Sequence, residues 1–413
     1  MGQLKTQTTP QVDNVQDIND FLKTVLANLH SSVFVLSGER AIRSANKSGI
    51  ALLGKDEKAV INQVFGNALD CMNTEGGRLE CGFTPYCKDC PLLYMVQNIF
   101  ENNQPVIKNI FDRKNIEKSD GVVDKYFLYS ARAIQYQGEK MVLLIVDDIT
   151  ENEKQKRFLE EKNAQIYSSI RYAKRIQTAL LPSRQEMEAY LKESFVTYFP
   201  RNIIGGDFYW LAKVDNKTVV AVGDCTGHGI PGALLTMLGI YSLNDVVKGK
   251  KETDPSKILK YLRDQIVHDL DHSKKLSLHD GMDISICSID NDEAKIHFAG
   301  ANHKIALVND SNLHEISGDK IPVGYSAMEK EFTIQTIKYQ KDDMIYMFTD
   351  GYKDQFGGER NKKMGKKNFK HLLRKISQKE LYDQKSTLEY SFHKWKNKKE
   401  QVDDVTVLGF RLR

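Results

Sequence analysis

Short apolar runs separated by Gly, Asn and Asp turns dominate the C-terminal half of the chain. The runs with the pattern of strands are KTVVAVGD, MDISICSID, AKIHFAGA, KIALVND, DMIYMFTDG and VTVLGFRLR. The turn residues between several of them predict antiparallel hairpins. Helical periodicity interrupts the strands over residues 231–247, 255–271 and 385–395. This mixture predicts an α+β domain over residues 185–413 rather than a parallel, doubly wound sheet.

A long helical pattern precedes that domain, because residues 150–181 contain no Gly or Pro and many charges. Apolar residues recur every seven positions, at Leu159, Ile166, Ala173 and Leu180, with Ile170 and Ile176 beside them. This stripe suits a two-stranded coiled coil, in which Asn163 could fix the register. A single amphipathic helix packed on its own domain is the alternative. We expect residues 151–184 to form a helical dimerisation linker, with a homodimer joined through residues 151–181.

The pattern of residues 15–150 is that of a small α/β domain. An amphipathic segment, INDFLKTVLANL, precedes two short strands around a Ser-Gly turn in SVFVLSGERAIRSAN. The end of the segment is rich in strands, with KYFLYSARAIQY and KMVLLIVDDIT. This order resembles a PAS sensor domain, including the terminal DDIT that often leads into an output helix. We expect the polar residues 1–14 to be a disordered N-terminus.

Composition adds limits on partners and location. The chain has 413 residues, 41% apolar and 28% charged, which is typical of soluble globular proteins with two or three domains. A net charge of +4 does not favour nucleic-acid binding, although residues 362–375, KKMGKKNFKHLLRK, are locally basic. No apolar run approaches the roughly 18 residues of a membrane span, and the start lacks a secretion signal. We therefore expect a cytoplasmic protein without membrane insertion.

Aspartates lie at strand ends or beside glycines in the C-terminal domain: Asp207 in GGDFYW, Asp224 in VGDCTGHG, Asp350 in FTDGY, and Asp403 and Asp404 in QVDDVTVL. If their strands share one end of a sheet, the carboxylates converge and repel one another. Mg²⁺ and Mn²⁺ remove that cost, because they prefer carboxylate, carbonyl and water oxygens. An aspartate beside a glycine usually only makes a turn, but four such motifs together favour a metal site.

The glycines around these aspartates fit the same interpretation. Gly223 and Gly227 let the backbone pass close to an ion or a phosphate, and Gly205 and Gly206 do so before Asp207. The helix predicted to open at Pro231 would leave its partly positive end facing the site.

The motifs GGDFY, GDCTGHGIPGAL, AGANHK, TDGYKDQF and DDVTVL, in this order, resemble the SpoIIE-type bacterial branch of the metal-dependent (PPM, type 2C) serine/threonine protein phosphatases. The preceding SSIRYAKRIQTALLP resembles the helix that leads into that branch's catalytic domain. The resemblance implies an αββα sandwich with a binuclear Mn²⁺ or Mg²⁺ centre. It also implies a phosphoserine or phosphothreonine protein as substrate, such as an anti-sigma factor antagonist with a STAS domain, under the control of the N-terminal sensor.

When the family's ligands are transferred motif by motif, the resemblance implies that Asp207 and Asp224 are the central metal ligands and that Asp224 bridges both ions. The carbonyl of Cys225 takes the place of a glycine carbonyl. Asp350 and Asp403 complete the ligand shell, with Asp404 as the alternative to Asp403. Asp283 in GMDISIC either holds a further ion or simply begins a strand.

Residues near the predicted metal ligands have possible roles in binding phosphate, transferring a proton or shaping the pocket. His228 could protonate the leaving oxygen or pack at the helix start, and Arg201 could bind phosphate with Gly227 or form a surface salt bridge. His303 in GANHK is expected to shape the pocket. Because water activated by two metal ions attacks phosphorus directly, Cys225 is not expected to be a nucleophile. Residues 362–375 are either a lid for an acidic protein substrate or a solvated helical face.

Four cysteines cluster within 20 residues: Cys71, Cys81, Cys87 and Cys90. The spacing of CKDC suits a metal, so the cluster could bind Zn²⁺ or an iron–sulfur centre. A thiol redox switch and reduced structural cysteines are the alternatives. Two rival functions therefore remain open. One is a catalytically dead scaffold, and the other is a metal or redox sensor with secondary phosphatase output.

Overall fold

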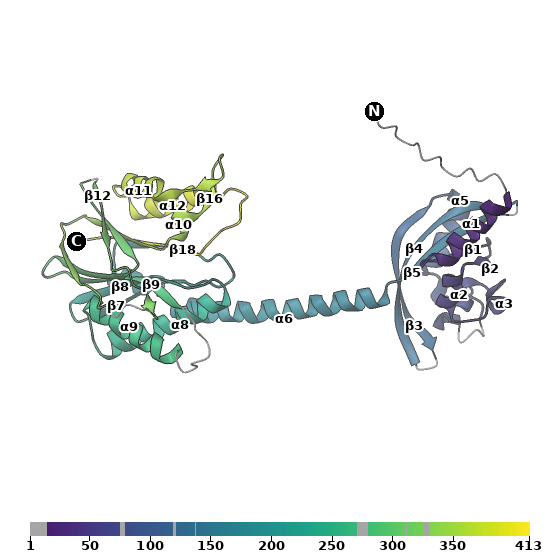
Figure 1. Ribbon diagram of the computed structural model, residues 1–413, viewed down its shortest axis with the longest axis horizontal. Coiled ribbons are helices and arrows are strands. Elements are labelled where there is room, and N and C mark those ends of the chain that lie inside the picture. The colour runs from purple at the N-terminus through teal and green to yellow at the C-terminus, as the bar shows by residue number, and fades with distance from the viewer. Residues whose placement is uncertain are drawn as a thin grey trace, which may run out of the picture. The chain divides into compact units, whose positions relative to one another are not determined.

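The computed structural model describes residues 15–74, 79–118, 121–136, 138–270, 280–310, 312–325 and 330–413. The predicted disordered N-terminus, residues 1–14, lies outside these ranges. The chain divides into two compact units, Met1–Asn163 and Ala164–Arg413, coloured purple to blue and teal to yellow in Figure 1.

The N-terminal unit is one antiparallel five-stranded sheet with helices on one face (Figure 1). The strand order is β2-β1-β5-β4-β3. Its core joins aromatic and aliphatic side chains of the strands and helices, among them Phe34, Phe65, Phe127 and Leu144. The main elements are α1 (Val15–Asn28), β1 (Ser32–Leu36), β2 (Ile42–Ala45), α2 (Lys47–Leu53), α3 (Glu57–Val60), α4 (Phe65–Ala68), α5 (Pro91–Asn102), β3 (Val106–Lys118), β4 (Gly121–Tyr136) and β5 (Glu139–Asp148). Strand β3 is additional to the strands that the sequence pattern predicts.

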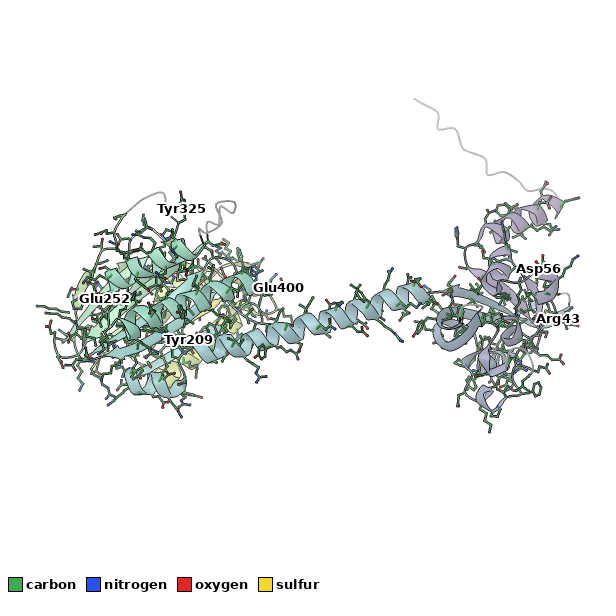
Figure 2. The ribbon with its side chains drawn as sticks, turned by 90° about the horizontal axis from the view of Figure 1, so that it is seen from below. Arg43, Asp56, Tyr209, Glu252, Tyr325 and Glu400 are labelled. Atoms are coloured by element: carbon green, nitrogen blue, oxygen red, sulfur yellow. The ribbon has the colours of Figure 1, made fainter. Side chains whose placement is uncertain are left out.

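Helix α6 (Thr150–Leu180) is the helix predicted between the two domains. It begins where the Asp148 carboxylate accepts a hydrogen bond from the Thr150 amide, and it ends just before Pro182. The predicted apolar stripe lies on its surface, with Leu159 60% and Ile166 55% exposed. Tyr209, labelled in Figure 2, lies beside the end of this helix and donates to the Pro182 carbonyl at 3.5 Å.

The C-terminal unit is built on two antiparallel sheets packed face to face. The first has the order β14-β10-β9-β8-β7, with β13 on β9, and the second has the order β12-β11-β15-β18-β6. The strands are β6 (Ser194–Phe199), β7 (Asp207–Val214), β8 (Lys217–Cys225), β9 (Gly281–Asp290), β10 (Lys295–Ala301), β11 (Lys304–Asn309), β12 (Asn312–Ser317), β13 (Val323–Gly324), β14 (Gln335–Lys338), β15 (Met344–Phe348) and β18 (Val405–Arg411). Val220 and Phe298 of the first sheet pack with Ile345 and Leu408 of the second to form the central core.

Helices cover both outer faces of this pair of sheets (Figure 1). On the first sheet lie α8 (Ile230–Leu243), the π-helical turn η3 (Asn244–Gly249) and α9 (Pro255–Leu270), and on the second lie α11 (Gly365–Ile376) and α12 (Leu381–Lys396). The layer order is therefore helix–sheet–sheet–helix, and the predicted α+β class and αββα sandwich are confirmed for this domain. Short α7 (Arg184–Tyr190) precedes β6.

Two helical segments have features that composition alone leaves open. The segment Ile230–Gly249 has the length and apolar composition of a membrane span, but 56% of it is buried, and Leu235, Ile240 and Leu243 lie in the core. Its apolar composition is explained by its packing against the sheet. The basic residues 365–376 form α11, whose Phe369 and Leu373 are buried while Lys366 and Lys367 are exposed. These exposed lysines make a solvated helical face.

Candidate active site

Three aspartates stand side by side across three neighbouring strands. In the antiparallel register, Asp207 of β7 is opposite Asp224 of β8, and Asp224 is in turn opposite Asp283 of β9. Directly opposed residues project from the same face of a sheet, with Cβ atoms about 5 Å apart. Asp283 is therefore more than the start of a strand, because it extends this row of carboxylates.

The second sheet contributes the other carboxylates. Asp350 follows β15 and lies at the residue before the short helix α10 (Gly351–Asp354), and Asp403 precedes the adjacent strand β18. The hydroxyls of Thr349 and Thr406 donate to Asp207 Oδ2 at 2.6 and 2.8 Å and so join the two sheets. The expectation that all these aspartates share one end of a single sheet is wrong, since they meet at one edge of a two-sheet sandwich.

Asp207 is only 1% exposed, and its two oxygens differ. Oδ2 accepts the two threonine hydroxyls, whereas Oδ1 is buried with no hydrogen-bond partner among the described residues. Burial, together with repulsion from Asp224, raises the pKa of Asp207 well above its usual range. A buried carboxylate oxygen without a donor is costly unless a cation compensates it.

Asp224 experiences the same crowding. Burial, followed by repulsion from Asp350, Asp403 and Asp283, raises the pKa of Asp224 to about 8. Burial also raises the pKa of Asp283 and that of Asp350, against the pull of the nearby Lys353 ammonium on Asp350. This donor set of closely placed carboxylates fits divalent cations, which would restore the ionised forms.

The side chains alone do not form a closed ion cage. Within the described ranges, no three His, Cys, Asp or Glu side chains converge closely enough to hold one ion among them. An ion at this edge must therefore take part of its ligands from backbone carbonyls or water, as Mg²⁺ commonly does.

Asp403 and Asp404 have different environments. Asp404 is 3% exposed, and its Oδ1 and Oδ2 accept the backbone amides of Arg201 and Gly206 at 2.5 and 2.6 Å. A Cβ atom on Gly205 would lie 2.9 Å from Asp404 Oδ1, so this glycine is needed for the approach. Asp404 thus anchors the 201–206 loop. Asp403 is half-buried; burial raises its pKa, whereas the charges of Arg201 and His228 lower it.

The loop after Asp224 passes close to Gly206. The Cys225 amide and the Thr236 hydroxyl both donate to the Gly206 carbonyl, at 3.2 and 2.7 Å. A Cβ on Gly206 would lie 2.7 Å from the Gly227 carbonyl oxygen, and Gly227 itself has φ +82°. The Cys225 thiol is buried, and burial raises its pKa, so it is not the activated thiolate of a cysteine nucleophile.

The remaining predicted residues surround this edge at different depths. His228 and Arg201 are exposed, and both are near enough to Asp403 for their charges to lower its pKa. His303 is buried rather than lining an open pocket, and burial followed by the charge of Lys353 lowers its pKa to about 4. His303 therefore has the environment of a neutral core histidine.

Several residues that hold the site were missed in the sequence. Thr349 and Thr406 occur inside the quoted motifs, one residue before Asp350 and two after Asp404, but their spacing reveals no shared partner. Asn302, which follows AGA in AGANHK, donates to Asp283 Oδ1 at 2.9 Å.

Gln177, in the last turn of α6, is a further such residue. It is 3% exposed, and its Nε2 donates to the Gly205 carbonyl at 2.7 Å while its Oε1 accepts from the Gly205 amide at 3.3 Å. Helix α6 is therefore hydrogen-bonded to the backbone two residues before Asp207.

Comparison with known proteins gives consistent matches to this domain. Residues 214–413 match the family described as "Stage II sporulation protein E (SpoIIE)". A curated relative, the phosphoserine phosphatase RsbU of Bacillus subtilis (strain 168), is 23% identical over 190 residues, which are 45% of this chain and 54% of RsbU. The chain thus spans about half the length of that relative.

The chain is also similar to solved structures of phosphatase domains. The SiaA-PP2C domain of Pseudomonas aeruginosa is 29% identical with a TM-score of 0.56, covering 61% of this chain and 99% of that domain. A structure of the PP2C phosphatase domain and a fragment of the regulatory domain of SpoIIE from Bacillus subtilis is 13% identical with a TM-score of 0.45, covering 71% of each chain.

Proposed function

The C-terminal domain of this chain is a SpoIIE/PP2C-type phosphatase domain, and we propose that the protein is a metal-dependent phosphatase of bacterial signal transduction that removes phosphate from a phosphoserine or phosphothreonine protein. One observation gives the main support for this proposal. Asp207, Asp224 and Asp283 stand in register across three strands, and a buried oxygen of Asp207 lacks a partner among the described residues.

The metal ligands that we propose combine this row of carboxylates with the ligand set that the motif resemblance implies. Asp207 and Asp224 would hold two Mn²⁺ or Mg²⁺ ions together with Asp350, Asp403 and the Cys225 carbonyl, and Asp283 would be available to a further ion. When bound, such ions supply positive charge against the carboxylates and Lewis acidity that activates water toward phosphorus. We propose Asp403 rather than its alternative Asp404 as the ligand, because Asp404 is 3% exposed and already anchors the 201–206 loop through two backbone amides.

Other residues of the chain position the phosphate and the protons. Arg201, which is exposed, and the backbone at Gly227, which precedes helix α8, would bind phosphate oxygens. His228, which is exposed and whose charge lowers the pKa of Asp403, would give a proton to the leaving serine or threonine oxygen. Thr349 and Thr406 keep Asp207 oriented through Oδ2 and leave Oδ1 open.

A phosphatase assay on a phosphoserine peptide, with Mn²⁺, with Mg²⁺ and with EDTA, tests this function. We expect hydrolysis with either ion and none with EDTA, and loss of hydrolysis in Asp224→Asn. The matched control is Asp264→Asn, an exposed aspartate on α9. A catalytically dead scaffold, the alternative, predicts no hydrolysis under any of these conditions.

We also propose that the N-terminal unit, residues 15–150, is a PAS-like sensor that controls the phosphatase domain of residues 185–413 through the 151–184 linker. The antiparallel sheet with helices on one face supports the PAS-like assignment. The contact of Gln177 with Gly205 supports the linker as the route to the active site. The exposed stripe of α6 supports a homodimer. A STAS-domain regulator as substrate and a cytoplasmic location complete this proposal by analogy with relatives.

A second candidate function belongs to the cysteine cluster of the N-terminal unit. Burial raises the pKa of Cys81, the charge of Arg40 lowers it, and the thiols of Cys87, Cys90 and Cys71 raise it, so the four thiols lie within electrostatic range of one another. The Gly82 amide donates to Cys87 Sγ at 3.3 Å, an orientation that favours a thiolate. On the CKDC spacing and this grouping in the sequence, we propose that Cys71, Cys81, Cys87 and Cys90 bind Zn²⁺ or an iron–sulfur centre.

A further inference from the structure

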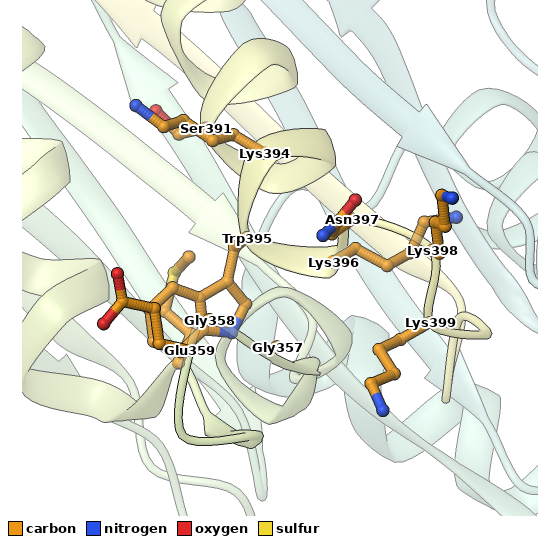
Figure 3. A pocket seen from close by; sticks show the side chains of 11 residues that line it. Gly357, Gly358, Glu359, Ser391, Lys394, Trp395, Lys396, Asn397, Lys398 and Lys399 are labelled. Carbon is orange, nitrogen blue, oxygen red and sulfur yellow. The ribbon is translucent and has the colours of Figure 1, made fainter.

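A basic cavity of about 510 Å³ lies at the end of helix α12 (Figure 3). Trp395 is its aromatic wall, and Gly357 and Gly358 lie beside the indole. Four lysines line it against a single acidic residue, Glu359. These lysines are Lys394, Lys396, Lys398 and Lys399.

The cavity is held in shape by backbone contacts. The Gly358 amide donates to the Trp395 carbonyl at 2.9 Å, and the Trp395 indole N–H donates to the Gln355 carbonyl at 3.0 Å. A Cβ atom on Gly357 would collide with the Trp395 carbonyl oxygen, so the close packing requires glycine. The short hairpin of β16 (Phe356–Gly357) and β17 (Lys362–Lys363) is thereby fixed on the end of α12.

The lysines of the cavity are not neutralised by neighbours. Among the described residues, no carboxylate forms an ion pair with Lys396, Lys398 or Lys399, and Lys394 contacts only the ring of Tyr390 as a cation–π partner. The surrounding segment 357–400 holds fourteen Lys or Arg residues and five Asp or Glu residues, a net charge of +9 in a chain of net +4. The positive charge of this protein is therefore concentrated here, and it attracts an anionic partner.

Buried Gln355 connects the cavity to the catalytic edge. Its Nε2 donates to the carbonyl of Glu400 (labelled in Figure 2) at 2.9 Å, and its Oε1 accepts from the Val402 amide at 3.2 Å. Asp350 lies five residues before Gln355, and Asp403 lies four residues after Lys399. Four residues span at most ~14 Å, so this wall of the cavity is within reach of a short extended peptide bound at Asp403.

We propose that this cavity docks an acidic segment of the phosphoprotein substrate, a few residues from the phosphorylated side chain. This inference rests on the proposed phosphatase function and adds the substrate class. Carboxylates of the segment would meet the four lysines, and an apolar or aromatic side chain between them would meet Trp395. Because the docked segment is remote from the reacting phosphate, docking strengthens binding of the right substrate without changing the chemistry.

Steady-state kinetics on three substrates tests the inference. They are a phosphoserine peptide with Asp and Glu three to five residues from the phosphoserine, the same peptide with Asn and Gln there, and p-nitrophenyl phosphate. The wild-type protein should show a lower KM for the acidic peptide at equal kcat. The double variant Lys398→Glu/Lys399→Glu should raise that KM by about tenfold or more, equivalent to ~1.4 kcal/mol, with p-nitrophenyl phosphate hydrolysis unchanged.

The matched control is Lys192→Glu/Lys213→Glu, which makes the same change of charge at exposed positions outside this cavity. It should leave the KM for the acidic peptide within about twofold of the wild type, a difference of ~0.4 kcal/mol. Equal KM values for the two peptides in the wild type, or equal effects of the two double variants, would overturn the docking inference while p-nitrophenyl phosphate hydrolysis continues. Absence of p-nitrophenyl phosphate hydrolysis in Mn²⁺ would instead overturn the phosphatase function on which it rests.

Discussion

Asp207 and Asp224 face each other directly across β7 and β8, and both carboxylates project toward the second sheet. Two like charges in opposed positions destabilise a sheet. Burial raises the pKa of both groups, and mutual repulsion raises that of Asp207 further. The pair is thus a local cost to folding that bound cations would relieve, and the first prediction follows from it.

Metal-free protein should lose stability as the pH rises from about 4 to about 8. Asp224 has an ordinary pKa near 3.9 in the unfolded chain and about 8 in the folded one. Between these values the folded state binds more protons than the unfolded state, so the free energy of unfolding falls as pH increases. Thermal melts in EDTA across this range measure the effect.

The variant Asp224→Asn should remove much of that slope. At pH 8 in EDTA its melting temperature should lie at least about 2 °C above that of the wild type, because the repulsion is gone. With Mn²⁺ added, the order should reverse, since the wild type gains the stabilisation of bound ions. Asp264→Asn should change neither result, and a melting temperature of Asp224→Asn below the wild type in EDTA would contradict the repulsion.

Substitutions of the neighbouring residues Asp403 and Asp404 should affect different properties, one the activity and the other the stability. Asp404→Asn should lower the free energy of unfolding by about 1.5–3 kcal/mol, because charge-assisted bonds from the Arg201 and Gly206 amides are weakened. Asp403→Asn should leave the unfolding free energy near that of the wild type but reduce Mn²⁺-dependent hydrolysis. Denaturant titration and the phosphatase assay, run on both proteins, distinguish the two roles. The reverse pattern would make Asp404 the ligand.

Substitution of Gln177 should disturb the site from the linker side. Gln177→Leu leaves the buried carbonyl and amide of Gly205 without their partner, which should cost about 1–3 kcal/mol of unfolding free energy. It should also make phosphatase activity insensitive to deletion of residues 1–149, if the signal passes through this contact. Gln165→Leu, exposed on the same helix, is the control. Retention of a full response to the deletion in Gln177→Leu would exclude this route.

The exposed stripe of α6 should support dimers. Leu159→Glu/Ile166→Glu places charges on two residues that are 60% and 55% exposed in the single chain, so it should not unfold a monomer. Light scattering after size-exclusion chromatography should give a dimer for the wild type and a monomer for the variant. A monomeric wild type at micromolar concentration would contradict the homodimer.

The cysteine cluster makes a separate prediction. Metal analysis of protein purified without oxygen should find zinc or iron in the wild type and lose it in Cys87→Ser/Cys90→Ser. Cys225→Ser is the control, because that thiol is buried in the other unit. Equal metal content in the wild type and the double variant would leave the thiols as structural or redox-active groups.

Much of the fold was readable in the sequence, since apolar runs such as KTVVAVGD and KIALVND became β8 and β11, and the glycine-free segment became α6. The motif aspartates were predicted because each lies beside glycines or a strand end. That Asp350 and Asp403 come from a second sheet was not predictable, because packing of two sheets is decided by side chains far apart in the chain. Thr349, Thr406 and Gln177 were missed for the same reason, since their partners are distant in sequence.

The most direct test of the central claim measures metal content and phosphoserine hydrolysis together in the wild type and Asp224→Asn. The account predicts two Mn²⁺ ions per wild-type chain by calorimetry, activity abolished by EDTA and restored by Mn²⁺, and loss of both binding and activity in Asp224→Asn. Phosphoserine hydrolysis that survives EDTA treatment, or that persists unchanged in Asp224→Asn, would contradict it.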